Sequence, residues 1–495
     1  MNDLPDPGML AALAIVLPLV GAVGVLLTRR WPDVREGISL ATGITLFCLV
    51  AVIAVALESG EAIHLQLATP LEGPTITLDV EPLGMLFALI ASGLWVVTTI
   101  YAIGYMRGHH EQNQTRFYTF FAVAIASAMG VAFAGNMLTL FVFYEALTIS
   151  TFPLVTHAGT LEARRAGRTY LGILLGTSIG LQLVAIIGTY AYAGTLDFAP
   201  GGILEGRVPD AMAGILLLLY VFGVGKAALM PFHRWLPAAM VAPTPVSALL
   251  HAVAVVKAGV FTVLKVAVFI FGFDLLNELS MTLMLQWVAA FTIIAASLVA
   301  MTKDNLKARL AYSTISQLAY IVLAALLANQ SGFLGGGLHI ATHAFGKITL
   351  FFCAGAILVA AHKSEISQLD GMGRVMPWTF AAFLVGSLSI IGLPPFGGLW
   401  SKWLLFEGAL DAHQTVFIVV LCLSTLLNIA YLLPIPFRAF FRPLPEGAAA
   451  TRHEAPVACL IGMAVTSLGC LTLFFFPDPI LALLASSPVV MGGLP

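Results

Sequence analysis

Five ionisable side chains lie inside long apolar stretches of this sequence. Glu145 lies in the run LTLFVFYEALTISTFPL, and four other apolar runs contain Lys226, Lys257, Lys347 and Lys402. A lysine at the centre of a lipid bilayer costs about 2.5–3.5 kcal/mol on insertion scales, and ionisable residues there usually mark ion or proton routes. These residues therefore predict a buried polar path whose chemistry is proton transfer. A structural ion pair between Glu145 and one lysine is the alternative interpretation.

Three histidines extend this set. His339, His343 and Lys347 follow one another at intervals of four residues, which places them on one stripe of a helix, where they could form a hydrogen-bonded relay. His251 is as consistent with a helix-packing donor as with a proton carrier. Two histidines four residues apart also fit a metal site, but no third ligand is apparent nearby. The five cysteines lie in apolar runs without a C-x-x-C pair. We therefore expect neither a metal nor a cofactor.

Two of the lysines stand beside helix-breaking residues. Lys226 lies in FGVGKAALMPFHRWLP, and Lys402 follows the glycines and prolines of LPPFGGLWSKW. Proline removes a helix hydrogen bond and glycine tolerates unusual backbone angles, so both helices should be interrupted there. Broken helices at matching places in two halves of a chain are the best sequence indication of a transporter's binding region. Ordinary proline kinks would not explain why a lysine lies beside each break.

The composition indicates the surroundings of these residues. The chain has 495 residues, of which 59% are hydrophobic and 10% charged, and its mean hydropathy is +0.97. Soluble proteins average about 45–50% apolar and about 25% charged residues. This composition excludes a soluble enzyme, a nucleic-acid binder and a disordered scaffold.

Apolar runs long enough to cross a bilayer recur from end to end. A helix needs about 20 apolar residues to cross the hydrocarbon core, and we count about fourteen such runs, the first of them retained because it lacks the basic start of a cleavable signal. Residues 62–80 alternate apolar with polar around a Pro-Gly turn and predict a short hairpin on the membrane surface. The expected spans are 8–28, 37–57, 82–106, 117–135, 137–157, 169–193, 211–230, 244–270, 281–302, 308–329, 333–361, 377–412, 415–437 and 456–486.

The charges divide between the two sides of this arrangement. Most of the 23 Lys and Arg residues follow an odd-numbered span, whereas the loops on the other side hold Arg207 and a cluster of Asp and Glu. By the positive-inside rule the odd-numbered loops face the cytoplasm, so both termini lie outside. Lys265 lies near enough to a helix end to extend its charge to the surface. We expect a multi-pass protein of the bacterial inner membrane.

The two breaks fall in the seventh and twelfth spans, five spans apart. This spacing implies two five-helix repeats of opposite topology, because moving a helix by an odd number of crossings inverts it. The predicted fold is an all-α integral membrane protein of about fourteen helices with broken helices 7 and 12. Its segments are an N-terminal three-helix segment at 1–116, a first repeat or half-channel at 117–270, a second inverted repeat at 281–437 and a C-terminal helix at 438–495.

Four ordered motifs resemble one family. The stretches LFVFYEALTISTFPLV, PFHRWLPAAMVAPTPVSALLHAVAVVKAGVF, HIATHAFGKITLFFCAGAI and LPPFGGLWSKW together resemble the proton-conducting antiporter-like subunits. That family includes the large subunits of Mrp-type Na+/H+ antiporters and the antiporter-like membrane subunits of respiratory complex I and related hydrogenases. The resemblance is strongest from about 117 to 412, and it implies fourteen helices with inverted five-helix repeats.

The resemblance gives roles to individual residues. Glu145 matches the glutamate of the family's fifth helix, and Lys226 matches the lysine of its broken seventh helix. Lys257 matches the eighth-helix lysine that links the two half-channels, and His251 matches the histidine at the start of that helix.

The second half of the chain follows the same pattern. His343 and Lys347 match the family's eleventh-helix pair, and Lys402 matches the terminal lysine of the broken twelfth helix, which is glutamate in some relatives. The mechanism that we expect begins with a pair between Glu145 and Lys226. Their separation would send a proton through His251 and Lys257 to the second repeat.

The resemblance favours a proton-translocating subunit of a multisubunit cation (Na+)/H+ antiporter of Mrp type. One alternative is a proton-pumping subunit of complex I or a membrane-bound hydrogenase, without a flavin or iron–sulfur cluster of its own because suitable cysteines are lacking. Another is a membrane channel that serves a soluble inorganic-carbon uptake protein. In each case we expect an ion-transport subunit rather than an enzyme. Its partners would be other membrane subunits, protons, Na+ and lipid, and no nucleic acid.

Overall fold

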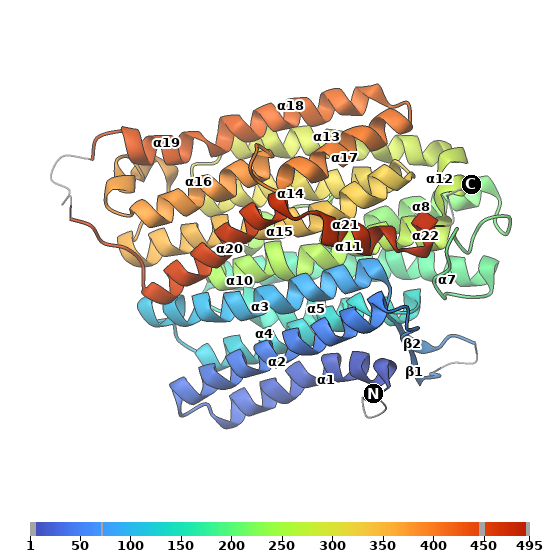
Figure 1. The fold of residues 1–495 in the computed structure, drawn as a ribbon, viewed down its shortest axis with the longest axis horizontal. Coiled ribbons are helices and arrows are strands. Elements are labelled where there is room, and N and C mark those ends of the chain that lie inside the picture. The colour runs from blue at the N-terminus through green and yellow to red at the C-terminus, as the bar shows by residue number, and fades with distance from the viewer. Residues whose placement is uncertain (1–5, 71–72, 445–450, 492–495) are drawn as a thin grey trace.

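Long helices lying side by side make up nearly all of the molecule (Figure 1). The computed structural model describes residues 6–70, 73–444 and 451–491, and the side chains of His251 and Met491 are also outside the described part. Within these residues, eleven helices are long and apolar enough to cross a membrane. They are α1 (Pro7–Leu27), α2 (Pro32–Glu58), α3 (Pro82–Gly108), α4 (Gln114–Ala132), α5 (Met137–Val155), α6 and α7 (Leu161–Thr177 and Leu183–Ala193, joined by a π-helical turn), α13 (Ser280–Thr302), α14 (Leu306–Leu326), α15 (Gln330–Ala361), α18 with α19 (Thr415–Leu432 and Pro434–Phe441) and α20 (Val457–Phe475).

Three further segments have the length of a crossing but are interrupted. The first runs from α8 (Asp210–Gly223) to α9 (Trp235–Ala238), and the second joins α10 (Thr244–Ala248) to α11 (Val255–Val266) with a π-helical turn at each end of α11. The third comprises α16 (Pro377–Ile391) and α17 (Gly398–Asp411). In the described part of the chain, these three segments and the eleven long helices together make fourteen possible crossings, the number expected from the sequence. The remaining short helices are α12 (Phe273–Glu278), α21 (Asp478–Ala485) and α22 (Pro488–Met491).

Both expected breaks are confirmed. After α8 the chain leaves the α conformation at Val224 and makes a single 3-10 turn at Gly225–Ala227. After α16 the chain turns at Gly392, whose φ of +84° lies in the region that favours glycine, and the helix resumes only at Gly398. The lysines at positions 226 and 402 therefore stand in or just after unwound backbone.

The expected surface hairpin is also confirmed. Strands β1 (His64–Ala68) and β2 (Ile76–Asp79) pair antiparallel, with His64 opposite Asp79. Asn136, at the start of α5, holds the hairpin by donating from Nδ2 to the carbonyl oxygen of Thr75 at 2.8 Å and to Oγ1 of Thr77 at 2.9 Å. Turn residues 71–72 lie outside the described part. Figure 1 shows that the hairpin lies at one end of the helix bundle.

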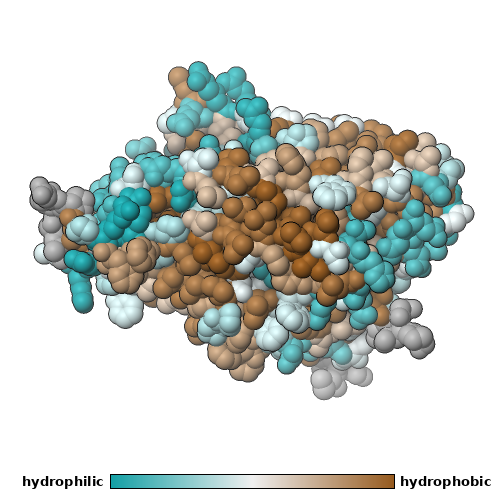
Figure 2. Space-filling view, turned by 90° about the horizontal axis from the view of Figure 1, so that it is seen from above, coloured by the Kyte–Doolittle hydropathy of each residue, from teal (hydrophilic) through white to brown (hydrophobic). Residues whose placement is uncertain are grey.

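The surface has the pattern of a membrane protein. Figure 2 shows hydrophobic residues across the middle of one face and hydrophilic residues gathered toward the ends of the long axis. Large apolar side chains such as Phe291, Val419 and Leu426 are more than 60% exposed, an arrangement that suits lipid and not water. At one end Asp370 accepts a hydrogen bond from Arg438 at 2.6 Å. The helix α15 packs against α3, α14, α16, α17 and α20, which makes it the centre of the bundle.

Candidate functional site

The first broken helix places Lys226 against α5. The lysine is fully buried. Its Nζ donates to the carbonyl oxygen of Tyr144 at 2.8 Å and to Oγ1 of Thr148 at 2.5 Å, and it lies 3.1 Å from the centre of the Tyr144 ring. The indole of Trp235 donates to the carbonyl oxygen of Gly225 at 2.9 Å. This bond satisfies one backbone group that the break leaves without a helical partner.

Glu145 lies beside this arrangement without joining it. Both of its carboxylate oxygens are shielded from solvent and have no hydrogen-bond partner among the described residues. The direct pair expected with Lys226 is not formed in this structure, because the ammonium is turned toward the neighbouring carbonyl and hydroxyl of α5. The carboxylate is still near enough to interact with Lys226 through space. A buried carboxylate without a partner costs several kcal/mol, which favours a functional reason for its presence.

Glycine lets the next helix approach the break closely. A Cβ atom on Gly259 of α11 would lie 2.4 Å from the backbone nitrogen of Ala227 and 2.8 Å from Cβ of Lys226. Only glycine fits so near a neighbouring backbone. The sequence thus brings α11, which carries Lys257, directly against the segment that carries Lys226.

A direct contact joins the two halves of the chain. The Nζ of Lys257 on α11 lies 2.6 Å from Nδ1 of His343 on α15, and both side chains are buried. At this distance the two nitrogen atoms share a proton, either as ammonium donor and imidazole acceptor or as imidazole donor and amine acceptor. Lys257 and His343 are therefore close enough for a proton to pass directly from one to the other.

The stripe of α15 continues this contact toward the second break. The rings of His339 and His343 lie 5.9 Å apart and nearly parallel, and Nδ1 of His339 lies 2.9 Å from Oγ of Ser401. The adjacent Lys402 donates from Nζ to the carbonyl oxygen of Ile391 at 2.8 Å. Ile391 ends α16, so the break supplies an unpaired carbonyl, at the negative end of a helix dipole, for the ammonium.

Lys402 also borders a cavity. Its Nζ lies 3.2 Å from Oγ1 of Thr425 on α18. A cavity of about 370 Å³ lies between α17 and α18 and is lined by Lys402, Thr425, Cys422 and several apolar side chains. This cavity lies at the far end of the row from Glu145.

Lys347 occupies a branch of the same stripe. Its Nζ donates to Oγ of Ser313 on α14 at 2.5 Å. Ser313 in turn lies 2.9 Å from the hydroxyl of Tyr431, which donates to Asn428 on α18. Lys347 is therefore connected toward α18 by neutral groups, and it lies on the same helix face as His343.

The remaining predicted residue is His251. It lies in the π-helical turn Leu249–Val253 that separates α10 from α11. Its side chain is outside the described part, so its role stays a prediction. Single π-helical turns occur frequently at functional sites.

Sequence reasoning missed the hydroxyl groups that connect the charged residues. Thr148, Ser313, Ser401 and Thr425 each contact a buried lysine or histidine. Serine and threonine are common in membrane helices, where many only bond to their own backbone, so their type alone is a weak signal. The sequence did carry one signal for these hydroxyl groups: Thr148 lies one helical turn after Glu145, and Ser401 directly precedes Lys402.

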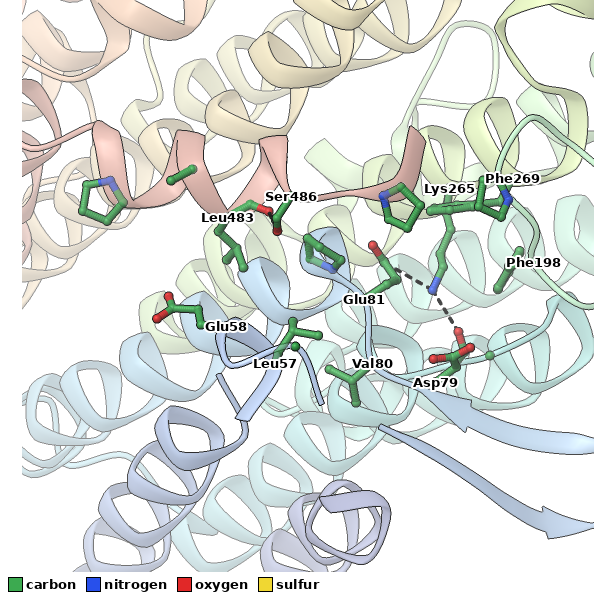
Figure 3. Close-up of a pocket in the computed structure, with 18 residues that line it drawn as sticks. Leu57, Glu58, Asp79, Val80, Glu81, Phe198, Lys265, Phe269, Leu483 and Ser486 are labelled. Atoms are coloured by element: carbon green, nitrogen blue, oxygen red, sulfur yellow. Dashed lines mark hydrogen bonds and ion pairs between the residues drawn. The ribbon is translucent and has the colours of Figure 1, made fainter. Parts of the chain in front are cut away.

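The interpretation of Lys265 was wrong. The residue is fully buried instead of reaching the surface, and its Nζ lies 3.4 Å from Oε1 of Glu81 and donates to the carbonyl oxygen of Ala134 at 2.8 Å. Glu81 comes from the start of α3, far from Lys265 in sequence, and supplies the partner that makes burial possible. Figure 3 shows Lys265 extending toward Glu81 with Phe198 and Phe269 beside it.

The chain is similar to known proteins over nearly its whole length. Residues 134–428 match the model of the family described as NADH:quinone oxidoreductase/Mrp antiporter, TM. The chain is 31% identical over 504 aligned residues to NADH-quinone oxidoreductase subunit N of Desulforudis audaxviator (strain MP104C), covering 98% of both chains. The chain belongs to the NADH:quinone oxidoreductase/Mrp antiporter family. It is therefore an antiporter-like membrane subunit of Mrp or complex I type.

Other members of the NADH:quinone oxidoreductase/Mrp antiporter family are longer. The chain is 29% identical to an Na(+)/H(+) antiporter subunit of Alkalihalophilus pseudofirmus, where the match covers 86% of this chain but 55% of that protein. Among solved structures, a chain of the membrane-bound sulfane sulfur reductase, an archaeal respiratory membrane complex, is similar with a TM-score of 0.85 and 25% identity over 97% of both chains. The helical architecture is thus shared by members from different assemblies.

Proposed function

We propose that this chain is the proton-translocating subunit of a multisubunit monovalent cation (Na+)/H+ antiporter of Mrp type. The observation that carries the proposal is the 2.6 Å contact between Lys257 on α11 and His343 on α15, which joins the two halves of the chain through buried side chains. The resemblance to an Na(+)/H(+) antiporter subunit supports the antiporter assignment. The chain would transport ions without redox chemistry of its own.

In the first half of the relay, Lys226 holds a proton between Tyr144 and Thr148. Movement of the ammonium between these neutral oxygens and the unpaired carboxylate of Glu145 gives the site two arrangements. The proton then passes to Lys257, with His251 and water as the bridging groups. Gly259 keeps this step short because it brings the two backbones together.

In the second half, His343 receives the proton from Lys257 directly. A histidine accepts a proton on one ring nitrogen and releases one from the other, so His343 and His339 pass it along the stripe of α15. Ser401 carries the connection to Lys402, and Lys347 adjusts the charge beside the stripe. The cavity beside Lys402 is the proposed exit toward water or a neighbouring subunit.

A second assignment has its own support. A relative that this chain matches over 98% of both lengths is a subunit of an NADH-quinone oxidoreductase, and the similar structure of 25% identity belongs to a respiratory membrane complex. In such an assembly the same relay would pump protons driven by a redox partner. A membrane channel for a soluble inorganic-carbon uptake protein is the third possibility.

Lys257→Met tests the relay. Purified complex is reconstituted into vesicles, and proton movement on addition of Na+ is followed with a pH-sensitive dye. We expect transport to fall by about tenfold or more, because methionine fills the space without carrying a proton. The matched control is Lys303→Met, since Lys303 stands at the end of α13 outside the relay. Undiminished transport in assembled Lys257→Met complex would reject the relay.

Copurification decides among the assemblies. Affinity purification of the full chain from its native membrane, followed by mass spectrometry, should recover several small multi-helix membrane subunits if the Mrp assignment is right. Iron–sulfur subunits would reject it in favour of a respiratory complex, and one large soluble zinc protein would favour the carbon-uptake assignment. Recovery from the inner-membrane fraction tests the proposed localisation.

A further inference from the structure

A cavity of about 690 Å³ lies at the end of the bundle that carries the hairpin β1–β2 (Figure 3). Glu58, Asp79 and Glu81 contribute three carboxylates to its lining, and Lys265 contributes one ammonium. Most of the other lining residues are apolar, and several come from α21. By the charge distribution of the loops, this end of the bundle is the outer one. The relay proposed above does not use this cavity.

Lys265 closes the inner end of the cavity. Its side chain is 1% exposed, and Glu81, its partner at 3.4 Å, is 16% exposed. Glu81 is itself fixed, because its two carboxylate oxygens accept from the backbone nitrogens of Leu83 and Gly84 at 2.8 Å each and so cap α3. The ring centre of Phe198 lies 4.5 Å from the Lys265 ammonium. The ammonium is therefore held by charge on one side and by an aromatic face on the other.

The same helix connects this closure to the relay. Lys265 follows Lys257 by eight residues on α11, so the two lysines lie on one face about 12 Å apart along the axis. Phe261 lies between them, is fully buried, and packs on Phe87 at a ring-centre distance of 5.2 Å. The ammonium of Lys265 lies 5.4 Å from the Phe261 ring. The ion pair of Lys265 with Glu81 and the aromatic pair of Phe261 with Phe87 thus lie along α11 between the cavity and Lys257.

We propose that Lys265 and Glu81 form the outer gate of the proton path. This inference rests on the proposed function, and it assigns the cavity as the outer aqueous mouth of the relay. While the ion pair is closed, the aromatic pair stays packed and water in the cavity is kept from Lys257. When the pair separates, the long lysine side chain moves into the cavity, and water reaches Lys257 along α11. Lys265 acts here as a positioning residue and carries no proton.

The test measures proton leak in vesicles that contain the complete complex. An acid pulse is applied outside without Na+, and the pH inside is followed. We expect Lys265→Met to admit protons several-fold faster than the wild type, and Glu81→Gln to do the same while retaining a capping oxygen. Lys265→Arg should behave like the wild type, because it keeps the ion pair. Glu58→Gln is the matched control, since Glu58 lines the same cavity but makes no contact with Lys265 among the described residues.

Three outcomes would overturn the gate. They are an unchanged leak in Lys265→Met, an equal leak in Lys265→Arg, or loss of transport in Lys265→Met without any leak, which would make the residue a proton carrier. Size-exclusion profiles and thermal unfolding confirm that each variant is assembled. If the gate alone is wrong, Lys257→Met still lowers Na+-dependent proton transport by about tenfold or more. If the proposed function is wrong, Lys257→Met and the wild type give the same signal on addition of Na+.

Discussion

Lys226 satisfies its buried charge with neutral oxygens, while the carboxylate of Glu145 beside it has no hydrogen-bond partner in the described part of the chain. Tyr144 and Thr148 hold the ammonium, and Glu145 contributes attraction at a distance. A lysine side chain is long and has several rotatable bonds, so it can exchange one set of partners for the other without moving a helix. Proton transport that depends on such an exchange needs both the unpaired carboxylate and the neutral oxygens.

Glu145→Gln should therefore impair transport without disturbing the fold. The amide retains the size of the side chain but cannot attract the ammonium, and we expect Na+-dependent proton movement to fall by about tenfold or more. The control is Glu162→Gln, which removes a carboxylate at the exposed start of α6. Equal activity of the Glu145→Gln and Glu162→Gln complexes would contradict the role of Glu145.

Asp370 offers a test of stability against pH. Its hydrogen bond with Arg438, supported by Arg442 at 3.2 Å, lowers the pKa of the Asp370 carboxyl below its usual range. A lowered pKa in the folded state means that the stabilisation is present above the ordinary pKa of about 3.9 and is lost as pH falls through the folded value. Asp370→Asn should lower the unfolding temperature at pH 7 by removing about 0.5–1 kcal/mol.

The pH series checks the sign of this effect. Thermal unfolding of the detergent-purified protein is measured for wild type and Asp370→Asn at intervals from pH 7 down to pH 3. The difference between them should be constant down to about pH 4.5 and narrow below about pH 4, because this carboxyl then takes up a proton in the unfolded chain first and in the folded protein only at still lower pH. A difference that widens in acid would contradict the assignment.

At the scale of elements, close backbone approach positions the relay. The helix α11 can lie against the Lys226 segment because Gly259 has no side chain. We expect Gly259→Ala to destabilise the protein by about 1–3 kcal/mol through overpacking. It should also slow transport, since α11 would have to move away from the break. Thermal unfolding and vesicle transport measure the two effects.

Gly172 provides the matched control for this substitution. It lies in α6, and a Cβ atom there would meet nothing within 4 Å. Gly172→Ala should leave transport unchanged and should be neutral or stabilising by up to about 1 kcal/mol, because alanine favours the helix. Equal destabilisation by the two variants would contradict the requirement for glycine at position 259.

The two breaks and the hairpin were predictable because their signals are local. Glycine and proline beside Lys226 and Lys402 act on their own helices, and the alternating pattern of residues 62–80 describes one pair of strands. The partner of Lys265 was not predictable, because Glu81 approaches it from a distant part of the chain. The position of the Lys226 ammonium was not predictable either, because it depends on which face of α5 packs against the broken segment.

At the scale of the whole molecule, the loops predict an orientation that labelling can test. Single cysteines are placed at Glu205 and at Arg165 after the native cysteines have been replaced, and intact cells are treated with a membrane-impermeant maleimide. We expect label at position 205 and none at position 165 until the membrane is opened, because the positive-inside rule predicts that the arginine-rich loops face the cytoplasm. The reverse pattern would invert the molecule and place the cavity of Lys265 on the inner side.

The division into half-channels at 117–270 and 281–437 is a proposal at this same scale. The row from Lys226 to Lys402 crosses this division through the contact between Lys257 and His343. The charged residues of this row were visible in the sequence because lysine and glutamate are rare in apolar runs. Their order in space was not, since it is set by how α5, α11, α15 and α17 pack.

The row of lysines and histidines passes from the segment after α8 to α11, α15 and α17, and it follows the length of one helix only between His343 and His339 on α15. In the proposed relay most steps of the proton therefore go across the helices, whereas the electric field across a membrane points along the normal. A transmembrane voltage of 100 mV acts on a full crossing with about 2.3 kcal/mol per charge, but it does almost no work on steps across the helices. Voltage should therefore govern mainly how protons reach and leave the two ends of the row.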